Sequence, residues 1–446
     1  MKRLLASLLC ASMLLVSFAG CGSKEAAPSS TPETAPETPA SSTEAETEPT
    51  GEGATIELWL HQNEAWNASH QTIADQYMSE NPGQEIVIKT FPYSDFLSKI
   101  QTSLLSGGEG ADIYEMWGGW ALDFTGTGAL AEVPADISAT FENFYAPVLG
   151  AYTRDGKYYG VPLEFNIEYG GLLVNKKLFG EKGLEYPKTW ADIEKIADAT
   201  SSKDGEVMNL RGFDFVSEDN ILYTFLAMIL SSGGSYLTED GKVDFTTPEA
   251  VDAMTTLVSY VRDKGYTNLD GITSGKEGYS FVYTDESMMD IVGPWAVADG
   301  SASYGLEYGT DYEYIALPPY KEPVKFAAET GWGLTVAESS DAKDAAWKYV
   351  AYFDSPEVLV KHNIACSQIP PRTEIVEMQE YKDGMPYAQP LLDILPAGQF
   401  IGPFNTTTIK ENIDNIFTEL CTTDNYPTIK DGLVALTDNL NTAFFG

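Results

Sequence analysis

From residue 54 to the end of this 446-residue chain, strand-like and helix-like patterns follow one another repeatedly. Residues 56–60 alternate in character and residues 85–91 are rich in β-branched side chains, and both features are typical of strands. Between them a helical pattern runs from about Trp66 to Glu80 and ends at the Asn-Pro-Gly of residues 81–83. The repeated alternation predicts an α/β fold of mostly parallel sheets covered by helices.

Turn and capping signals mark the ends of further elements. Ser94 is expected to cap a helix, and the Asp-Gly pair at 155–156 predicts a hairpin turn. Thr189 is followed three residues later by an aspartate, which resembles a capping box. Thr247 before Pro248 has the form of an N-cap followed by proline at the first helical position.

The N-terminus has the pattern of an export signal. Two basic residues precede an apolar run at 4–18, which is too short to span a bilayer as a stable helix. The Phe-Ala-Gly-Cys of residues 18–21 resembles a bacterial lipobox, although that motif usually has leucine where Phe18 stands. The resemblance implies a signal peptide at 1–20 and lipidation of Cys21, which would anchor the protein to the outer face of the bacterial cell membrane. An ordinary secretory signal with a chance cysteine is the alternative.

Residues 22–53 differ in composition from everything that follows. They hold seven Glu, six Thr, five Pro, five Ser and five Ala, and no aromatic or aliphatic side chain larger than alanine. Such a segment buries too little apolar surface to offset its ordering entropy. Residues 21–53 are therefore expected to form a disordered tether behind the lipidated cysteine.

Charge and residue counts exclude several classes of function. The formal net charge of -39 repels phosphate backbones, so nucleic acid is not an expected partner. Three histidines and four cysteines leave little scope for a zinc enzyme, and no metal or cofactor is expected. Outside the signal and Cys21 only Cys366 and Cys421 remain, either as a disulfide or as two buried thiols.

Five tryptophans are candidates for ligand contact because each follows or ends a predicted strand, where open α/β sheets place their crevices. Aromatic faces can cover the C–H face of a sugar ring, while carboxylates, amides and guanidinium groups bind its hydroxyls. Burial in the core is the alternative for the aromatic residues, and a solvated or structural role, such as a salt bridge of Arg372, for the polar ones. The candidates are Trp66, Trp117, Trp120, Trp295, Trp332, Glu64, Glu115, Glu164, Asn166 and Arg372.

Several short motifs, taken in order, resemble those of the extracellular solute-binding proteins of ATP-driven sugar importers, the group that includes maltose-binding protein. Each motif alone is weak, and the ordered set carries the resemblance. They are Asn-Pro-Gly at 81–83, Gly-Ala-Asp-Ile-Tyr-Glu-Met at 110–116, Asp-Gly-Lys-Tyr-Tyr-Gly-Val-Pro at 155–162, Val-Asn-Lys-Lys-Leu-Phe at 174–179, Pro-Lys-Thr-Trp at 187–190, Met-Met-Asp-Ile-Val-Gly-Pro-Trp at 288–295 and Ile-Pro-Pro-Arg at 369–372.

This resemblance implies a two-lobed fold of the type II periplasmic-binding-protein class, with three crossover segments and a ligand held between the lobes. The first lobe would comprise 54–164 plus 316–366, and the second 165–315 plus 367–446. Tyr223 and Phe404 join the candidate contacts by positional analogy alone. A carbohydrate ligand, an ABC transporter permease as partner and a monomeric state are implied.

Two alternatives stay open at this stage. The same fold can receive a solute that is not a sugar, and a secreted glycoside hydrolase could use a carboxylate pair such as Glu164 and Glu168. The chain contains no G-x-S-x-G, H-E-x-x-H or P-loop motif, and no catalytic residue is expected.

Overall fold

The computed structural model describes residues 53–106, 110–205 and 207–446. The predicted signal peptide, Cys21 and the predicted tether up to residue 52 lie outside the described residues. Within the described ranges no helix combines the length and the apolar composition that crossing a membrane requires.

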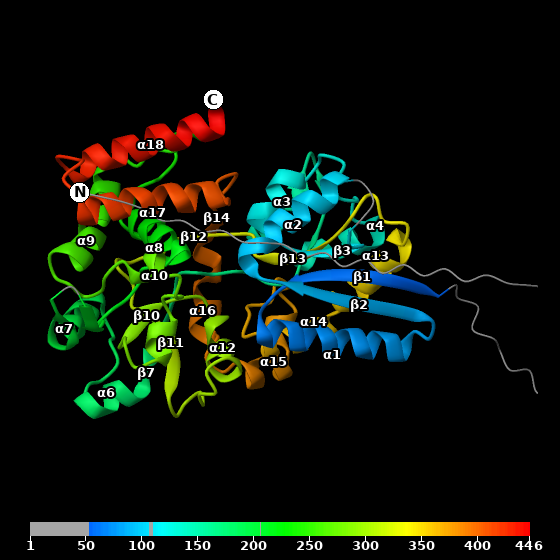
Figure 1. Ribbon diagram of the computed structural model, residues 1–446, viewed down its shortest axis with the longest axis horizontal. Coiled ribbons are helices and arrows are strands. Elements are labelled where there is room, and N and C mark those ends of the chain that lie inside the picture. The colour runs from blue at the N-terminus through cyan, green and yellow to red at the C-terminus, as the bar shows by residue number, and fades with distance from the viewer. Residues whose placement is uncertain (1–52, 107–109, 206) are drawn as a thin grey trace, which may run out of the picture. The chain divides into compact units, whose positions relative to one another are not determined.

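A five-stranded sheet organises the first group of elements, on the right of Figure 1. Its strand order is β2-β1-β3-β13-β6; β2 and β3 run parallel to β1, whereas β13 runs antiparallel to both β3 and β6. Helices α1 and α14 pack against each other, and α2, α3 and α13 pack on the strands. The bounds are β1 Ala54–His61, β2 Gln84–Phe91, β3 Ile113–Trp117, β6 Val161–Pro162, β13 Trp332–Val336, α1 Glu64–Glu80, α2 Tyr93–Ser106, α3 Gly118–Phe124, α13 Lys343–Phe353 and α14 Pro356–Ala365.

A three-stranded sheet of order β10-β7-β11, antiparallel throughout, organises the second group, on the left of Figure 1. Helix α17 packs against α8, α9 and α18, so the C-terminal helices belong to this group. The bounds are β7 Gly171–Asn175, β10 Met289–Ile291, β11 Tyr312–Ala316, α6 Lys176–Lys182, α7 Trp190–Thr200, α8 Glu218–Ser231, α9 Pro248–Arg262, α12 Ala296–Ala302, α16 Gln389–Ile394, α17 Thr407–Thr422 and α18 Ile429–Phe445.

The remaining elements are short. They are β4 Thr153–Arg154, β5 Lys157–Tyr158, β8 Ser202–Asp204, β9 Val207–Leu210, β12 Phe326–Ala328, β14 Gly398–Phe400, α4 Ala135–Ser138, α5 Ala146–Leu149, α10 Asp270–Thr273, α11 Ser280–Tyr283, α15 Gln379–Gly384, and the 3-10 turns Ala139–Asn143, Ile375–Glu377 and Leu395–Ala397.

The α/β, two-lobed fold is confirmed, but the expectation of mostly parallel sheets is wrong. Only β1, β2 and β3 form a parallel set within the larger sheet. The chain does not reach β6 and β13 by a simple strand-helix-strand repeat. Strand β13 runs antiparallel to both of its neighbours, β3 and β6. Alternation along the sequence predicts the class of the fold, whereas strand direction depends on how distant segments return to a sheet.

The predicted turn and capping signals are largely confirmed. Asp155 and Gly156 both have positive φ, 52° and 76°, as a two-residue hairpin turn requires. Thr189 forms the full capping box of α7, and the Thr247 side chain caps α9 with proline in the first turn. The prediction that Ser94 caps a helix is wrong, because α2 already begins one residue earlier, at Tyr93.

Two further features bear on the earlier expectations. Strand β12, which the expected boundaries place in the first lobe, pairs with β14 and packs on α8 of the second group. Cys366 is buried, Cys421 is half-buried and both are free thiols, so they form no disulfide with each other.

Candidate functional site

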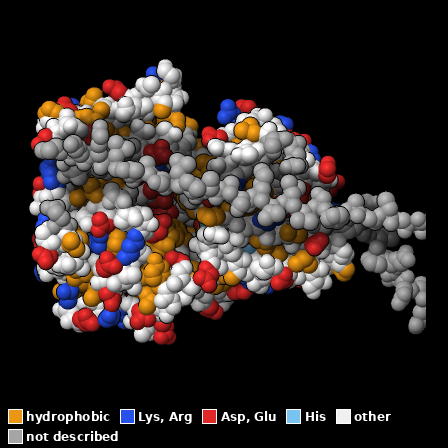
Figure 2. All heavy atoms as spheres, in the orientation of Figure 1, with side chains coloured by type: hydrophobic (Ala, Val, Ile, Leu, Met, Phe, Trp, Pro, Cys, Tyr) orange, Lys and Arg blue, Asp and Glu red, His pale blue; other side chains and the backbone are white. Residues whose placement is uncertain are grey.

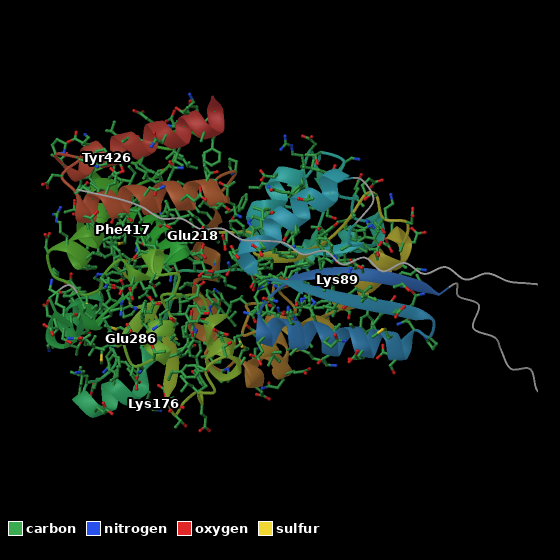
Figure 3. The ribbon with its side chains drawn as sticks, viewed as in Figure 1. Lys89, Lys176, Glu218, Glu286, Phe417 and Tyr426 are labelled. Atoms are coloured by element: carbon green, nitrogen blue, oxygen red, sulfur yellow. The ribbon has the colours of Figure 1, made fainter. Side chains whose placement is uncertain are left out.

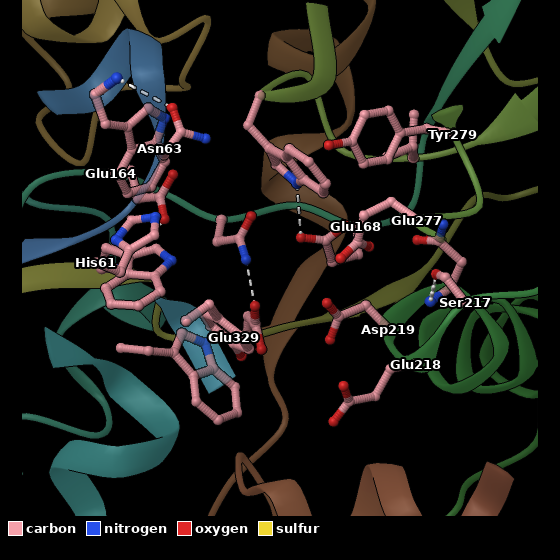
Figure 4. Close-up of a pocket in the computed structure, with 18 of the residues that line it drawn as sticks. His61, Asn63, Glu164, Glu168, Ser217, Glu218, Asp219, Glu277, Tyr279 and Glu329 are labelled. Atoms are coloured by element: carbon pink, nitrogen blue, oxygen red, sulfur yellow. Dashed lines mark hydrogen bonds between the residues drawn. The ribbon is translucent and has the colours of Figure 1, made fainter. Parts of the chain in front are cut away.

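A pocket of about 260 Å³ lies at one edge of the five-stranded sheet (Figure 4). His61 ends β1 and Trp117 ends β3, while Trp332 begins the antiparallel β13 and is in register with Trp117. Three neighbouring strands therefore present these side chains at the same edge. The lining residues are His61, Gln62, Asn63, Trp66, Tyr93, Trp117, Glu164, Asn166, Glu168, Ser217, Glu218, Asp219, Asn220, Glu277, Tyr279, Val292, Trp295, Glu329, Trp332 and Lys410.

One side of the pocket consists of interlocking rings, which we call the aromatic wall. The imidazole of His61 stacks on Trp332 with ring centroids 4.2 Å apart and an interplanar angle of 17°. Trp66 meets Trp332 edge-on at 5.9 Å, and the half-exposed Tyr93 lies 6.3 Å from the same indole. Flat, fixed rings of this kind suit the apolar face of a ring-shaped ligand. The aromatic wall is His61, Trp66, Tyr93, Trp117 and Trp332.

A buried network beneath the aromatic wall fixes the orientation of His61. The Glu115 carboxylate is fully buried, accepts a hydrogen bond from the His61 backbone N–H at 3.1 Å and lies 2.7 Å from the His61 ring Nδ1. Burial alone raises the pKa of Glu115, but the charges and hydrogen bonds of His61 and His70 outweigh burial and hold that pKa below its ordinary value. His70 in turn contacts the third histidine of the chain, His362, with ring centroids 4.9 Å apart. Glu115 therefore supports the wall from behind.

Carboxylates occupy the other side of the pocket, and we call Glu168, Glu218, Asp219 and Glu277 the acidic wall. Figure 4 shows His61 and Asn63 on one side and Ser217, Glu218, Asp219 and Glu277 on the other. In the space-filling view, acidic side chains gather in the hollow near the middle of the molecule (Figure 2).

The start of α8 supplies two of these carboxylates. The Ser217 side chain caps the helix by accepting the Asn220 N–H at 3.1 Å, so Glu218 and Asp219 lie in its first turn. Carboxylates in a first turn are stabilised by the positive end of the helix dipole. Figure 3 shows Glu218 on the side of its lobe nearest the five-stranded sheet.

Glu168 contributes the most buried carboxylate of the acidic wall, with only 4% of its surface exposed. Its Oε1 accepts a hydrogen bond from the indole N–H of Trp295 at 3.0 Å. Among the described residues its Oε2 has no hydrogen-bond partner. Burial raises the pKa of Glu168 well above its ordinary value, and the charges of Asp219 and Glu329 raise it further.

Glu164, Glu329 and Lys410 also line the pocket. Glu164 accepts the Trp332 backbone N–H at 3.0 Å, and burial raises the pKa of Glu164 to about 8. The Lys410 ammonium pairs with Asp219 and lies 3.5 Å from the nearer Glu329 oxygen and 4.0 Å from the ring centroid of Trp117. Within the described part of the chain, Lys410 is the one lysine or arginine that lines the pocket.

Six of the twelve predicted contact residues line the pocket: Trp66, Trp117, Glu164, Asn166, Trp295 and Trp332. Three others lie next to it without lining it. Glu64 is exposed at the start of α1, Glu115 lies beneath His61, and Trp120 is buried edge-on behind Trp332 with centroids 5.3 Å apart.

The remaining three predicted residues are held by other partners. Tyr223 is fully buried and reaches the site only through its hydroxyl, which donates to Glu329 at 2.8 Å. Arg372 donates to Asp354 at 2.7 Å and also pairs with Glu374. It therefore has the structural salt-bridge role that was the alternative to ligand contact. Phe404 is fully buried against Phe444, with centroids 5.0 Å apart.

The twelve predicted contact residues include no member of the acidic wall. Ser217 carries a helix-start signal, but Thr189 and Thr247 carry similar signals at helices that do not line the pocket. Lys410 had a usable signal, because it interrupts the buried apolar face of α17. The lining residues not predicted are His61, Gln62, Asn63, Tyr93, Glu168, Ser217, Glu218, Asp219, Asn220, Glu277, Tyr279, Val292, Glu329 and Lys410.

Known proteins resemble this chain in sequence and in fold. A maltotriose-binding protein of Pyrococcus abyssi is 24% identical over 321 residues, which cover 70% of this chain and 65% of that protein. An arabinooligosaccharide-binding protein of Halalkalibacterium halodurans is 22% identical over 274 residues, 60% of each chain. The chain therefore matches somewhat less than two thirds of the length of these relatives.

A solved structure agrees with the fold. An ABC substrate-binding protein of Listeria monocytogenes, in complex with cycloalternan, superposes with a TM-score of 0.72 at 21% identity, covering 88% of this chain and 99% of that one. The model of the bacterial extracellular solute-binding protein family matches residues 64–359, which is more than half of the chain. By that match, the chain belongs to the family of bacterial extracellular solute-binding proteins.

Proposed function

We propose that this protein is a receptor that captures a carbohydrate in the pocket between its lobes and delivers it to an ABC transporter permease. The observation that carries the proposal is the juxtaposition of the aromatic wall with hydrogen-bonding side chains in one pocket. The Trp332 indole, held between His61 and Trp66, offers a rigid apolar face. Asn63, Asn166 and the carboxylates offer partners for hydroxyl groups.

Capture requires only reversible binding, with closure of the lobes around the ligand. Hinge closure is a common response of two-lobed receptors, and a ligand that contacts both sides stabilises the closed state. Here Trp332 begins β13 and Trp295 directly precedes α12, and both line the pocket, so one ligand can contact both. The permease would then recognise the closed form.

Both members of the carboxylate pair considered for hydrolysis have structural partners. Glu164 accepts the Trp332 backbone N–H, and Glu168 accepts the Trp295 indole N–H. These contacts favour a binding role. The similar proteins reported above are also binding proteins. Turnover of a labelled oligosaccharide by catalytic amounts of the protein would contradict this assignment, whereas stoichiometric retention supports it.

The proposed location is the outer face of the cell membrane, with an anchor at Cys21 and residues 21–53 as the tether. Metabolic labelling with palmitate, followed by cell fractionation, tests the anchor. Cys21→Ser should abolish the label and release the protein from membranes. Labelling of that variant at the wild-type level would contradict the lipobox assignment, and the pocket would be unaffected by either outcome.

Isothermal titration calorimetry tests the function directly. Maltotriose, an arabinose trisaccharide, cellobiose and an amino-acid mixture are each titrated into the purified protein. A dissociation constant near 1 μM, about -8 kcal/mol, is the expected strength for a saccharide that the pocket accepts. Binding of amino acids with no response to any saccharide would reject the carbohydrate assignment.

A further inference from the structure

Acidic groups far outnumber basic groups in the lining of the pocket. Six carboxyl groups face it, and Lys410 supplies the one ammonium among the described lining residues. Burial keeps protons on Glu164, with a pKa of about 8, and raises the pKa of Glu168, and a neutral sugar brings no positive charge that would let these groups ionise. The six carboxylates are those of Glu164, Glu168, Glu218, Asp219, Glu277 and Glu329.

Lys410 is already engaged on one side of the site. Its ammonium pairs with Asp219, lies 3.5 Å from Glu329 and faces the ring of Trp117 at 4.0 Å. Within the described residues neither Glu218 nor Glu277 takes part in an ion pair within 4.0 Å, and both are exposed to the pocket. These two carboxylates therefore remain available to a cation from outside the protein.

Glu168 gives an independent sign that a ligand completes the site. Its carboxylate is 4% exposed, its Oε1 is held by Trp295, and its Oε2 has no hydrogen-bond partner in the described part of the chain. A buried carboxyl oxygen without a partner is unfavourable whether or not it carries the proton, so a native site normally fills such a position. The charged groups that face Glu168 are Asp219, Glu329 and Lys410, and two of these three repel its negative form.

Aromatic rings complete this corner of the pocket. Tyr279 lies edge-on to Trp295, with centroids 5.0 Å apart, and both rings line the pocket beside Glu168 and Glu277 (Figure 4). The Tyr279 hydroxyl donates to Asp299 at 2.8 Å, which fixes the phenol ring. Carboxylates combined with fixed aromatic faces are the usual recognition elements for an organic ammonium group.

The carboxylates come from separate segments: the loop at Glu168, the start of α8 and the loop before α11. Among the described residues no three His, Cys, Asp or Glu side chains come together as ligands of one metal ion. Charge that is spread along a wall matches an extended organic cation, whose amine and hydroxyl groups are several bonds apart.

We propose that the ligand is an amine-bearing saccharide, whose ring rests on the aromatic wall while its protonated amine is bound by Glu168 and Glu277. This inference rests on the proposed function and narrows its ligand to a cationic class. The ammonium group supplies the hydrogen-bond donor that Glu168 Oε2 lacks. It also supplies the positive charge that the acidic wall lacks.

The test compares matched ligands that differ only in having ammonium groups in place of hydroxyl groups. Glucosamine and glucose differ at their single C2, and the β-1,4-linked glucosamine disaccharide and cellobiose differ at C2 of both rings. Calorimetric titration of the wild-type protein at neutral pH should show at least about tenfold tighter binding for the amine of each pair, as charge-assisted hydrogen bonds imply. The preference should shrink as sodium chloride is raised.

Two variants with the same change of charge assign the effect to the acidic wall. Glu168→Gln keeps an acceptor for Trp295 but removes the charge, and it should reduce the amine preference about tenfold. Glu181→Gln, on the exposed surface of α6 and outside the pocket, should leave the preference unchanged. If Glu168→Gln unfolds, the exposed Glu277→Gln serves in its place.

The outcomes separate this inference from the proposed function. Micromolar binding of neutral saccharides with no preference for their amine counterparts would overturn the inference and leave the carbohydrate receptor standing. Binding of spermidine or CaCl₂ alone, with no response to any saccharide, would reject both. An equal loss of preference in Glu168→Gln and Glu181→Gln would also overturn the inference, because it would show a general effect of net charge.

Discussion

The two walls of the pocket are built by different physical means. The rings of the aromatic wall continue the hydrophobic core: Trp66, Trp117 and Trp332 belong to the same buried cluster as Phe96 and Trp120. The carboxylates of the acidic wall come from a helix start and from loops. Tight packing orients the first wall, whereas the second is oriented by helix capping and a few hydrogen bonds.

This difference predicts different roles for the walls in recognition. The aromatic wall is complete without a ligand, since each of its rings is already in contact with another ring, Trp117 with Trp120 outside the wall. The acidic wall retains the unpartnered Glu168 Oε2 and carboxylates without a cation. We therefore expect the aromatic wall to provide most of the affinity and the acidic wall to select among ligands.

The largest expected effect is on stability, and it tests whether the ligand-free pocket is short of positive charge. The folded protein holds the pKa of Glu164 at about 8, above its ordinary value of 4.5, because the group is buried. The folded chain thus retains a proton that the unfolded chain releases. This contribution to stability is complete below pH 4.5 and is lost as pH rises through about 8.

Denaturant unfolding at several pH values checks this prediction. Between pH 5 and pH 9 the Glu164 contribution to the free energy of unfolding should fall by about 4 kcal/mol. Glu164→Gln, which carries no charge at any of these pH values, should show a flatter pH profile than the wild type. A profile identical to the wild type would show that Glu164 ionises freely in the folded state.

The next largest effect concerns the centre of the aromatic wall. Trp332→Ala should weaken saccharide binding by about 3 kcal/mol, because this indole contacts His61, Trp66 and Tyr93 and holds the wall together. Trp332→Phe keeps a flat ring and should lose much less. Calorimetry gives the affinities, and circular dichroism establishes that both variants are folded.

A smaller effect is expected where the two walls meet. Trp295→Ala should weaken binding by about 1–2 kcal/mol, since it removes an aromatic face and the donor to Glu168 while the half-buried position tolerates truncation. Trp295→Phe separates the two contributions, because it restores the face without the N–H. Unchanged affinity in Trp295→Ala would remove this residue from the site.

The smallest effect marks the outer limit of the site. Glu64→Gln should change saccharide affinity by less than about 0.5 kcal/mol, because Glu64 is exposed at the start of α1 and does not line the pocket. Calorimetric titration of the same saccharide into Glu64→Gln and into Trp332→Ala compares the two losses of affinity. A loss of 1 kcal/mol or more would extend the ligand beyond the aromatic wall.

Much of the aromatic wall could be predicted, and the reason is local. Local patterns place Trp117 at the end of one strand and Trp332 at the end of another, but the two rings share a sheet edge only because β13 runs antiparallel to β3. Tyr223 and Phe404 failed to reach the pocket because positional analogy carries no information on side-chain direction. Both side chains are fully buried.

The amino-acid sequence by itself determined the α/β class, the family motifs, the capping box of α7 and the choice of Trp66, Trp117 and Trp332 as candidate contacts. Each of these depends on residues close in sequence. Only the tertiary structure decided which helix start faces the pocket and which cation balances it. Lys410 reaches Asp219 because α17 packs on α8, and that contact is set by side chains far apart in the chain. The charge balance of the site is therefore a property of packing between distant segments, which local patterns do not encode.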